Sequence, residues 1–144
     1  MTPSIVVPEH PGQEIRAKLS NLLVAYNESR TGPSGFELLA VILQDPDFSE
    51  LMGGLWGRSV YGWLFVEFLF VPQELRGRGL GSALLKRAEE IAIRRGCVGV
   101  CLDSFDFQAP TFYRKFGYEY FAELESPNGG FKRHFLRKFL KAAG

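Results

Sequence analysis

The segment from Val71 to Gly81 constrains the fold and chemistry of this chain more than any other. It reads VPQELRGRGLG and lies between the strongest strand pattern, Tyr61 to Val71, and the clearest helical pattern, which begins at Leu80. Alternating glycines remove side chains where a ligand has to approach the main chain. A helix that follows offers unpaired N–H groups and the positive end of its dipole. The segment therefore predicts a pyrophosphate cradle.

The glycines of this segment also fit a simple turn. A tight strand-to-helix turn that needs glycine for its backbone angles accounts for them equally well. Arg76 and Arg78 favour the cradle, because two like charges so close together repel unless an anion is present. A P-loop requires four residues between its glycines, followed by Lys and Ser/Thr, which are absent here. A Rossmann fingerprint fails on length, because only about forty residues follow Asp103, too few for the rest of a doubly wound sheet.

Hydrophobic periodicity predicts the remaining elements. Helical spacing predicts a helix over 13–27, and the Asn, Ser, Gly and Pro density of 27–35 predicts a loop. Further helices are expected from Leu80 to Arg95 and over two turns from Pro110 to Gly117. Strands are expected over 36–44, 51–56, 61–71, 98–102, 118–124 and 131–140. A strand, crossover helix, strand unit predicts that strands 61–71 and 98–102 lie side by side and parallel, in a single α/β domain over residues 1–144.

Composition excludes several classes of protein. Seventeen Lys and Arg against sixteen Asp and Glu leave a net charge of +1, too little to drive wholesale binding to nucleic acid or an anionic membrane. The longest apolar run, Trp63 to Val71, is far shorter than the roughly 20 residues that span a bilayer. Residues 1–12 carry no basic-then-apolar signal. We therefore expect a cytosolic protein without nucleic acid or membrane partners.

The cysteines and histidines form no metal or disulfide motif. Cys97 and Cys101 are four apart in a predicted buried strand, about 13 Å from each other, which is too far for a disulfide. Only His10 and His134 could join them, and the spacing matches no zinc site. No basic neighbour is expected to lower either thiol pKa. We predict a structural role for both cysteines and no bound metal.

The run from Phe131 to Phe139 alternates basic and aromatic residues. This superficially suggests RNA binding, but an edge strand with one solvated face has the same pattern and is favoured at this net charge. His134 has no motif partner in the sequence.

Two motifs together resemble a known family. Arg76, Gly79 and Gly81 match Arg/Gln-x-x-Gly-x-Gly/Ala, and a second element follows at the usual separation, formed by Asp106, Ala109, Tyr113, Arg114, Lys115, Gly117 and Tyr118. This pair of elements is similar to that of the GNAT superfamily of acetyl-CoA-dependent N-acyltransferases, and of its small stand-alone bacterial members in particular. The resemblance extends from Gly57 to the C-terminus. Asp106 stands where the family usually has Asn.

The resemblance implies a mixed, twisted central sheet with splayed parallel strands and flanking helices. The strands, here 61–71 and 98–102, would admit the pantetheine arm of acetyl-CoA between them, as an added strand. The implied cofactor-binding residues are Leu69, Phe70, Val71, Arg76, Gly77, Arg78, Gly79, Leu80, Gly81, Ser82, Asp106 and Tyr113. Acetyl transfer to the amine would be direct, without a covalent enzyme intermediate.

Catalytic candidates follow from the chemistry. The resemblance implies that Tyr113 protonates the leaving thiolate. Glu67 is our first candidate for the base, because it is the only charge in an apolar strand, where a carboxylate is costly without a purpose. Alternation places it on one face with Trp63, Phe65, Leu69 and Val71. A partly solvated strand face, or a pair with a neighbouring arginine, explains Glu67 equally well. Asp103 is the second candidate.

The function we predict is an N-acetyltransferase that acts on a primary amine of a small molecule. Acetylation of a protein N-terminus or lysine is an alternative, and so is an acyl-CoA-binding module of the same fold without turnover. Aromatic residues such as Trp56 and Trp63 weakly favour a compact apolar or cyclic amine. The acceptor itself and a homodimer are left open by the sequence.

Overall fold

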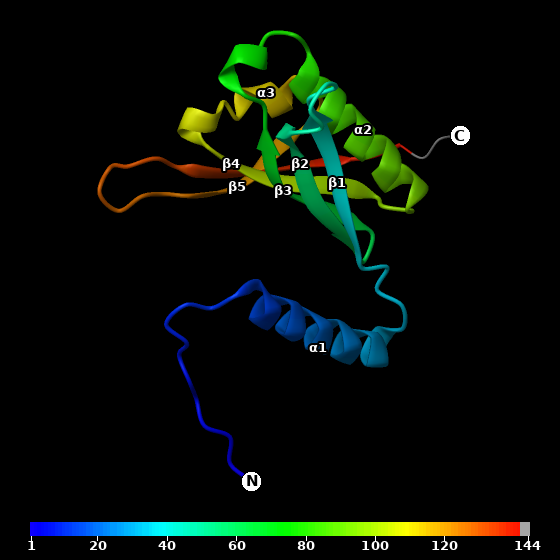
Figure 1. Ribbon diagram of the computed structural model, residues 1–144, viewed down its shortest axis with the longest axis vertical. Helices are drawn as coiled ribbons and strands as arrows, with labels where there is room; N and C mark the ends of the chain where they lie inside the picture. Colours follow the sequence, from blue (N-terminus) through cyan, green and yellow to red (C-terminus); the bar gives the residue numbers. More distant parts are fainter. Residues whose placement is uncertain (142–144) are drawn as a thin grey trace. The chain divides into compact units, whose positions relative to one another are not determined.

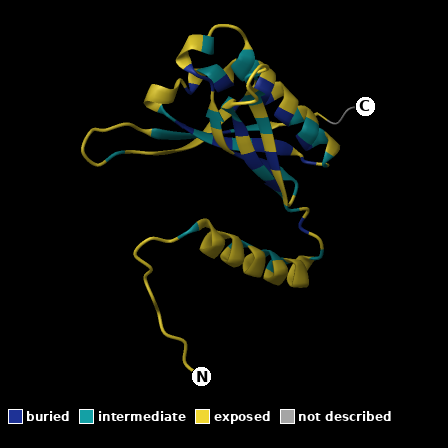
Figure 2. Cartoon of the chain, in the orientation of Figure 1, coloured by how far each residue is buried: buried dark blue, intermediate teal, exposed yellow. Residues whose placement is uncertain are grey.

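The computed structural model describes residues 1–141 and divides into two compact units at Ser34. The first contains one helix, α1 (Gln13–Thr31), none of whose residues is buried (Figure 2). This helix is longer than predicted and ends at Thr31, where the backbone N–H of the C-cap residue Gly32 donates to the carbonyl of Glu28 at 2.9 Å. The predicted single domain over 1–144 stays a prediction.

The second unit is a six-stranded mixed sheet with its helices. The elements are β1 (Glu37–Gln44), β2 (Leu51–Val60), β3 (Trp63–Phe70), η1 (Gln73–Leu75), α2 (Leu80–Arg94), β4 (Gly99–Phe105), η2 (Asp106–Gln108), α3 (Thr111–Arg114), β5 (Glu119–Leu124) and β6 (Arg133–Phe139). The strand order is β1-β2-β3-β4-β6-β5 (Figure 1). Only β3 and β4 pair in parallel, and the other neighbours are antiparallel. The predicted parallel pair is confirmed.

Three predictions about these elements were wrong. Strand β2 continues through Gly57 to Val60, paired on both sides, rather than ending at Trp56. Helix α3 has one turn instead of two, because Phe116 and Gly117 donate to carbonyls three residues back and tighten the chain after Arg114. Strand β6 is an inner strand, since it pairs with both β4 and β5, and β5 is the edge.

The core lies between the sheet and α2. Buried side chains of α2 pack with the buried residues of β1 to β4 and β6, and Figure 2 shows them gathered on the strands and on one side of the helix. The cluster contains Leu39, Leu55, Leu64, Val66, Leu85, Ala88, Ala92, Cys97, Val100, Leu102, Tyr113, Tyr118 and Leu136. This core fixes the parallel pair relative to α2, whose first turn follows the glycine-rich loop.

The parallel strands stop pairing before they end. The ladder joins residues 63–66 of β3 to residues 99–102 of β4, although β3 continues to Phe70 and β4 to Phe105. A bulge occurs at the same point, since Val66 faces Gly57 while Phe68 faces Trp56, which leaves Glu67 as an extra residue. The predicted separation of the two strands is therefore observed in their pairing.

The bulge overturns the prediction that Glu67 shares a face with Leu69 and Val71. Beyond it, Leu69 and Val71 pack on the core side of the sheet, as Val66 does before it, whereas Glu67 and Phe68 are exposed. Strict alternation would place Glu67 on the same face as Leu69 and Val71. The extra residue at the bulge moves Leu69 and Val71 to the opposite face.

Candidate active site

The loop after β3 holds one of its two arginines with its own backbone. The Nε of Arg76 donates to the carbonyl of Val71 at 2.9 Å, and its backbone N–H donates to Gln73. Arg78 is exposed and forms no ion pair or hydrogen bond with any residue among 1–141. The loop therefore presents one unpaired guanidinium beside the start of α2.

The loop requires its glycines for two different physical reasons. Gly77 and Gly79 have φ of +82° and +77°, the left-handed region that favours glycine; open space surrounds Gly77, and a Cβ on Gly79 would meet only the hydroxyl of Ser82 at 3.9 Å. Gly79 is the N-cap of α2 and no side chain caps the helix, so its first N–H groups have no partner within it. A Cβ on Gly81 would lie 3.3 Å from the ring of Phe112, so this glycine allows α3 to approach α2. Free N–H groups, open space and an unpaired cation fit a pyrophosphate.

A cavity of about 490 Å³ lies along α2 next to this loop. It is lined by Ser82, Ala83, Leu85, Lys86, Glu89, Phe116 and Lys138. The ammonium of Lys86 is exposed there, whereas Arg87 points its guanidinium at Glu90, with Nη1 and Oε2 3.4 Å apart. The cavity runs from the start of α2 towards β6 and is lined by two cations, of which Lys138 is paired with Glu89 and Lys86 forms no ion pair among residues 1–141.

Tyr113 is buried, and its hydroxyl forms no hydrogen bond with the described part of the chain. Its ring packs edge-on against Phe112 and Tyr118, with centroids 5.1 and 5.9 Å apart. Burial raises the pKa of Tyr113 to about 12, and the carboxylate of Asp103 adds to the rise. Asp103 is the first residue of β4 beyond the parallel ladder, so the carboxylate that acts on this hydroxyl lies where β4 no longer pairs with β3.

Tyr118 provides a contrast with Tyr113. Its hydroxyl donates to Glu89 of α2 at 2.8 Å, and Lys138 of β6 donates to the other carboxylate oxygen at 2.7 Å. Burial raises the pKa of Tyr118 far above its usual value, and Glu89 contributes further. This network joins α2, β6 and the start of β5, which is a structural role.

The two candidate bases differ in their surroundings. Glu67 is exposed at the bulge and makes no ion pair or hydrogen bond within residues 1–141. Asp103 is a quarter exposed, and its carboxylate accepts a hydrogen bond from Nε of Arg133. This bond raises the pKa of Arg133, so the guanidinium stays charged. Of the two candidates, Glu67 is therefore the one whose carboxylate has no partner among residues 1–141.

Asp106, predicted to contact the cofactor, has both carboxylate oxygens engaged by the protein. One accepts from the backbone N–H of Lys132 at 3.1 Å, and the other contacts Nε2 of His134. Sequence spacing could not indicate this partner of His134, because 28 residues separate it from Asp106. The aspartate at a position where the family has Asn was the one available signal.

Both thiols are unsuited to nucleophilic attack. Burial raises the pKa of Cys97 and of Cys101, and Asp103 raises the latter further. The expectation of no basic neighbour was wrong, because Arg95 and Arg137 each lower one of these pKa values, but burial outweighs them.

Residues 1–141 contain neither a membrane-spanning helix nor a metal cluster. None of the helices there is long and apolar enough to cross a bilayer. The same residues contain no group of three or more His, Cys, Asp and Glu side chains arranged as metal ligands.

Comparison with known proteins identifies the family. Residues 8–118 match the acetyltransferase (GNAT) family. The chain belongs to the GNAT acetyltransferase family. It is 34% identical over 135 residues to acetyltransferase Atu2258 of Agrobacterium fabrum, covering 94% of this chain and 98% of the relative. It is 44% identical over 92 residues to blasticidin-S acetyltransferase of Streptomyces morookaense, covering 63% and 68%.

Solved structures agree with this GNAT assignment. An acetyltransferase from Agrobacterium tumefaciens superimposes with a TM-score of 0.84 at 33% identity, covering 96% of this chain and 100% of that one. The fold is also that of an aminoglycoside 6'-N-acetyltransferase crystallised with coenzyme A, with a TM-score of 0.62 at 22% identity over 72% and 73% of the chains. The predicted fold, family and class of enzyme, an acetyltransferase with acetyl-CoA as co-substrate, are confirmed.

Proposed function

We propose that this GNAT protein transfers the acetyl group of acetyl-CoA directly to a primary amine of a small molecule. One observation carries the proposal. The parallel strands stop pairing with each other at Val66 and Leu102 while both continue. Beyond this point β3 leads to the glycine-rich start of α2, and β4 leads to α3, which holds Tyr113. This arrangement supports a cofactor arm that pairs with free strand backbone.

The residues present fit acetyl-CoA in three parts. The backbone beyond the bulge is available for the pantetheine arm, the first N–H groups of α2 and the guanidinium of Arg78 suit the pyrophosphate, and the cavity lined by Lys86 continues along α2. The residues we assign to binding are Leu69, Phe70, Val71, Arg76, Gly77, Arg78, Gly79, Leu80, Gly81 and Ser82. The engaged carboxylate of Asp106 argues against a direct cofactor contact by that side chain.

Acetyl-CoA supplies, when bound, a thioester whose carbonyl carbon an amine can attack. An alkyl ammonium has a pKa near ~10.4, so roughly one molecule in a thousand is neutral at pH 7 and a base is needed. The exposed carboxylate of Glu67 accepts this proton. As the carbon–sulfur bond breaks, Tyr113 donates its proton to the departing sulfur.

The pKa of Tyr113, raised to about 12, bears on this proton transfer. Against a free thiol near ~8.5, the phenol is the weaker acid by about 3.5 units, which costs about 5 kcal/mol. The desolvation that raises the pKa of the phenol also raises the pKa of a buried thiol, so the difference between the two pKa values becomes smaller. Tyr113 therefore stays protonated, as a donor must, until negative charge develops on the sulfur.

A small acceptor is supported by the named activities of relatives. One relative is named for blasticidin-S, and a structure with the same fold for aminoglycosides. The test is a screen of amino sugars, nucleoside antibiotics, polyamines, amino acids and peptides for acetyl-CoA-dependent thiol release, with mass spectrometry of each product. We expect acetylation of at least one small amine. Acetylation of peptides alone, or tight coenzyme A binding without any product, would contradict the proposal.

A further inference from the structure

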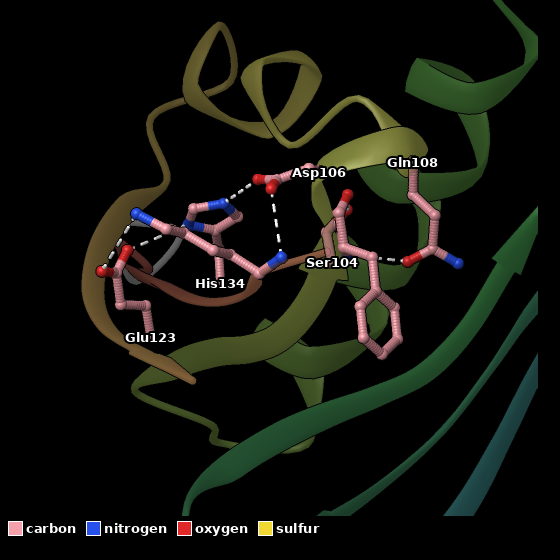
Figure 3. A network of polar contacts seen from close by, with 7 residues as sticks. Ser104, Asp106, Gln108, Glu123 and His134 are labelled. Carbon is pink, nitrogen blue, oxygen red and sulfur yellow. Dashed lines mark hydrogen bonds and ion pairs between the residues drawn. The ribbon is translucent and has the colours of Figure 1, made fainter. Parts of the chain in front are cut away.

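Three polar side chains from three different elements meet at the end of β4 (Figure 3). Asp106 begins η2, Glu123 lies in β5 and His134 lies in β6. The Nε2 atom of His134 contacts Oδ1 of Asp106, and its Nδ1 atom lies 3.7 Å from Oε2 of Glu123. The imidazole is only 17% exposed, whereas the two carboxylates are 46% and 45% exposed. One imidazole thus links the turn after β4 to both strands of the C-terminal hairpin.

Backbone hydrogen bonds reinforce this link. The N–H of Asp106 donates to the carbonyl of Lys132, and the N–H of Lys132 donates to Oδ2 of Asp106, both at 3.1 Å. Asp106 therefore uses one oxygen for a backbone N–H and the other for the imidazole. The bond from His134 is the largest of the contacts that hold the pKa of Asp106 below its usual range. The two bonds use the two carboxylate oxygens separately, so an asparagine, with one oxygen and one amide nitrogen in their place, would keep both only by donating to an unprotonated Nε2 of His134.

The turn that these contacts hold leads directly to Tyr113. After η2, Ala109 adopts φ of +57°, Pro110 is buried, and α3 follows with four residues. A single helical turn does not hold its own conformation in isolation, so its position depends on what surrounds it. Tyr113 is fixed on one side by its ring contacts and on the other by the chain that begins at Asp106.

We propose that Asp106 and His134 are positioning residues for acetyl transfer. The pair ties the turn after β4 to β6 and so aligns the Tyr113 hydroxyl with the thioester. This inference rests on the proposed function. It also accounts for two unusual features of the sequence. Asp106 stands where the family has Asn, and it is the partner that His134 lacks in the motifs.

The test is a double-mutant cycle on His134→Ala and Asp106→Ala, measured with an amine found in the screen. A matched cycle on Glu119→Ala and Arg137→Ala removes another β5–β6 ion pair, whose Nε and Oε1 atoms are 3.0 Å apart. We expect each substitution at the Asp106–His134 pair to lower kcat about tenfold, and the double variant to be no slower, because coupled residues act as a unit. Coenzyme A affinity should stay within about threefold, and the Glu119–Arg137 cycle should leave kcat unchanged.

A second readout follows the turn itself. Amide hydrogen exchange of the peptide covering residues 105–113 should accelerate in His134→Ala and stay at the wild-type rate in Arg137→Ala. His134→Gln, whose amide nitrogen can take the place of Nε2, should recover most of the lost kcat. Where an alanine variant does not fold, His134→Phe decides instead, because it keeps an aromatic ring in place and cannot bond to either carboxylate, and kcat should fall about tenfold.

The outcomes separate this inference from the proposed function. An active wild type with full kcat in His134→Ala, independent losses in the cycle, or unchanged exchange over 105–113 would overturn the pair's role and leave acetyl transfer standing. A wild type that acetylates no amine while binding coenzyme A would overturn the proposed function, and the positioning role with it.

Discussion

The connections that follow the two parallel strands are built in opposite ways. After β3, Leu75 and Arg76 donate to carbonyls three residues back, and the Arg76 side chain bonds to Val71, so the loop is held by its own residues. After β4, Gln108 accepts a hydrogen bond from the N–H of Phe105 at 2.8 Å, and the turn is also held by His134 of β6 and by Lys132, the residue before β6. The first connection is therefore held by local bonds alone, and the second depends on the tertiary fold as well. Substitutions in the first should act on cofactor binding, and those in the second on turnover.

The largest effect should come from Gly79→Asp. A carboxylate at the N-cap of α2 would occupy the proposed phosphate site and repel the anion, so coenzyme A affinity should fall by at least about 100-fold. Isothermal titration calorimetry measures this affinity. The matched control is Gly96→Asp, because Gly96 has φ of +80° and is surrounded by open space, but lies beyond the other end of α2. Wild-type affinity in a folded Gly79→Asp variant would end the assignment of the cradle.

Tyr113→Phe should have the next largest effect, on turnover alone. It keeps the ring and its contacts with Phe112 and Tyr118 and removes a hydroxyl that has no partner among residues 1–141, so stability should change little. A positioned proton donor contributes about 10² to 10⁴ in rate, and we expect kcat to fall at least tenfold at unchanged acetyl-CoA affinity. Steady-state kinetics with calorimetry measures both values.

Tyr118→Phe is the matched control for Tyr113→Phe. It removes a hydroxyl that donates to Glu89, so it should lower the free energy of unfolding by about 1 kcal/mol and leave kcat close to wild type. Full activity in Tyr113→Phe would assign proton delivery to water.

The pH dependence of stability should also report on Tyr113. Its pKa is about 12 in the folded state and about 10 when unfolded, so the folded state binds the proton more tightly between these values. Its contribution is complete below pH 10 and is lost as the pH rises to 12, by about 2 to 3 kcal/mol in total. Urea unfolding of the wild type and Tyr113→Phe at several pH values measures the difference. Parallel curves from pH 10 to 12 would refute the buried phenol.

Glu67→Gln tests the residue at which the two parallel strands separate. Because the carboxylate has no ion pair among residues 1–141, the melting temperature should barely move, while kcat should fall about tenfold with a changed acid limb of the pH profile. Glu119→Gln, another exposed strand glutamate, should leave kcat unchanged. A shifted melting temperature with intact turnover would make Glu67 structural.

The comparison of the two connections also shows what sequence can predict. The loop of residues 71–81 was interpretable because glycine dihedrals and helix capping are local properties, and the motif spacing of Arg76, Gly79 and Tyr113 indicated the family. The face that Glu67 shares with its neighbours could not be predicted, because a single bulge, set by pairing with β2, reverses the alternation after it. The partner of His134 depended on β6 being an inner strand, which follows from the order of the whole sheet.

The smallest effect distinguishes two neighbouring cations on α2. Lys86 lines the cavity that continues the cradle, whereas Arg87 is paired with Glu90, so the two side chains differ in availability rather than in charge. An exposed phosphate contact contributes up to about 1 kcal/mol, so Lys86→Ala should weaken coenzyme A binding about threefold to fivefold at low salt and less at high salt. Arg87→Ala should change the affinity by less than about twofold, since only its surface pair is lost. Equal losses in both variants would mean that the anion responds to the charge of the whole helix end, and would remove Lys86 from the binding site.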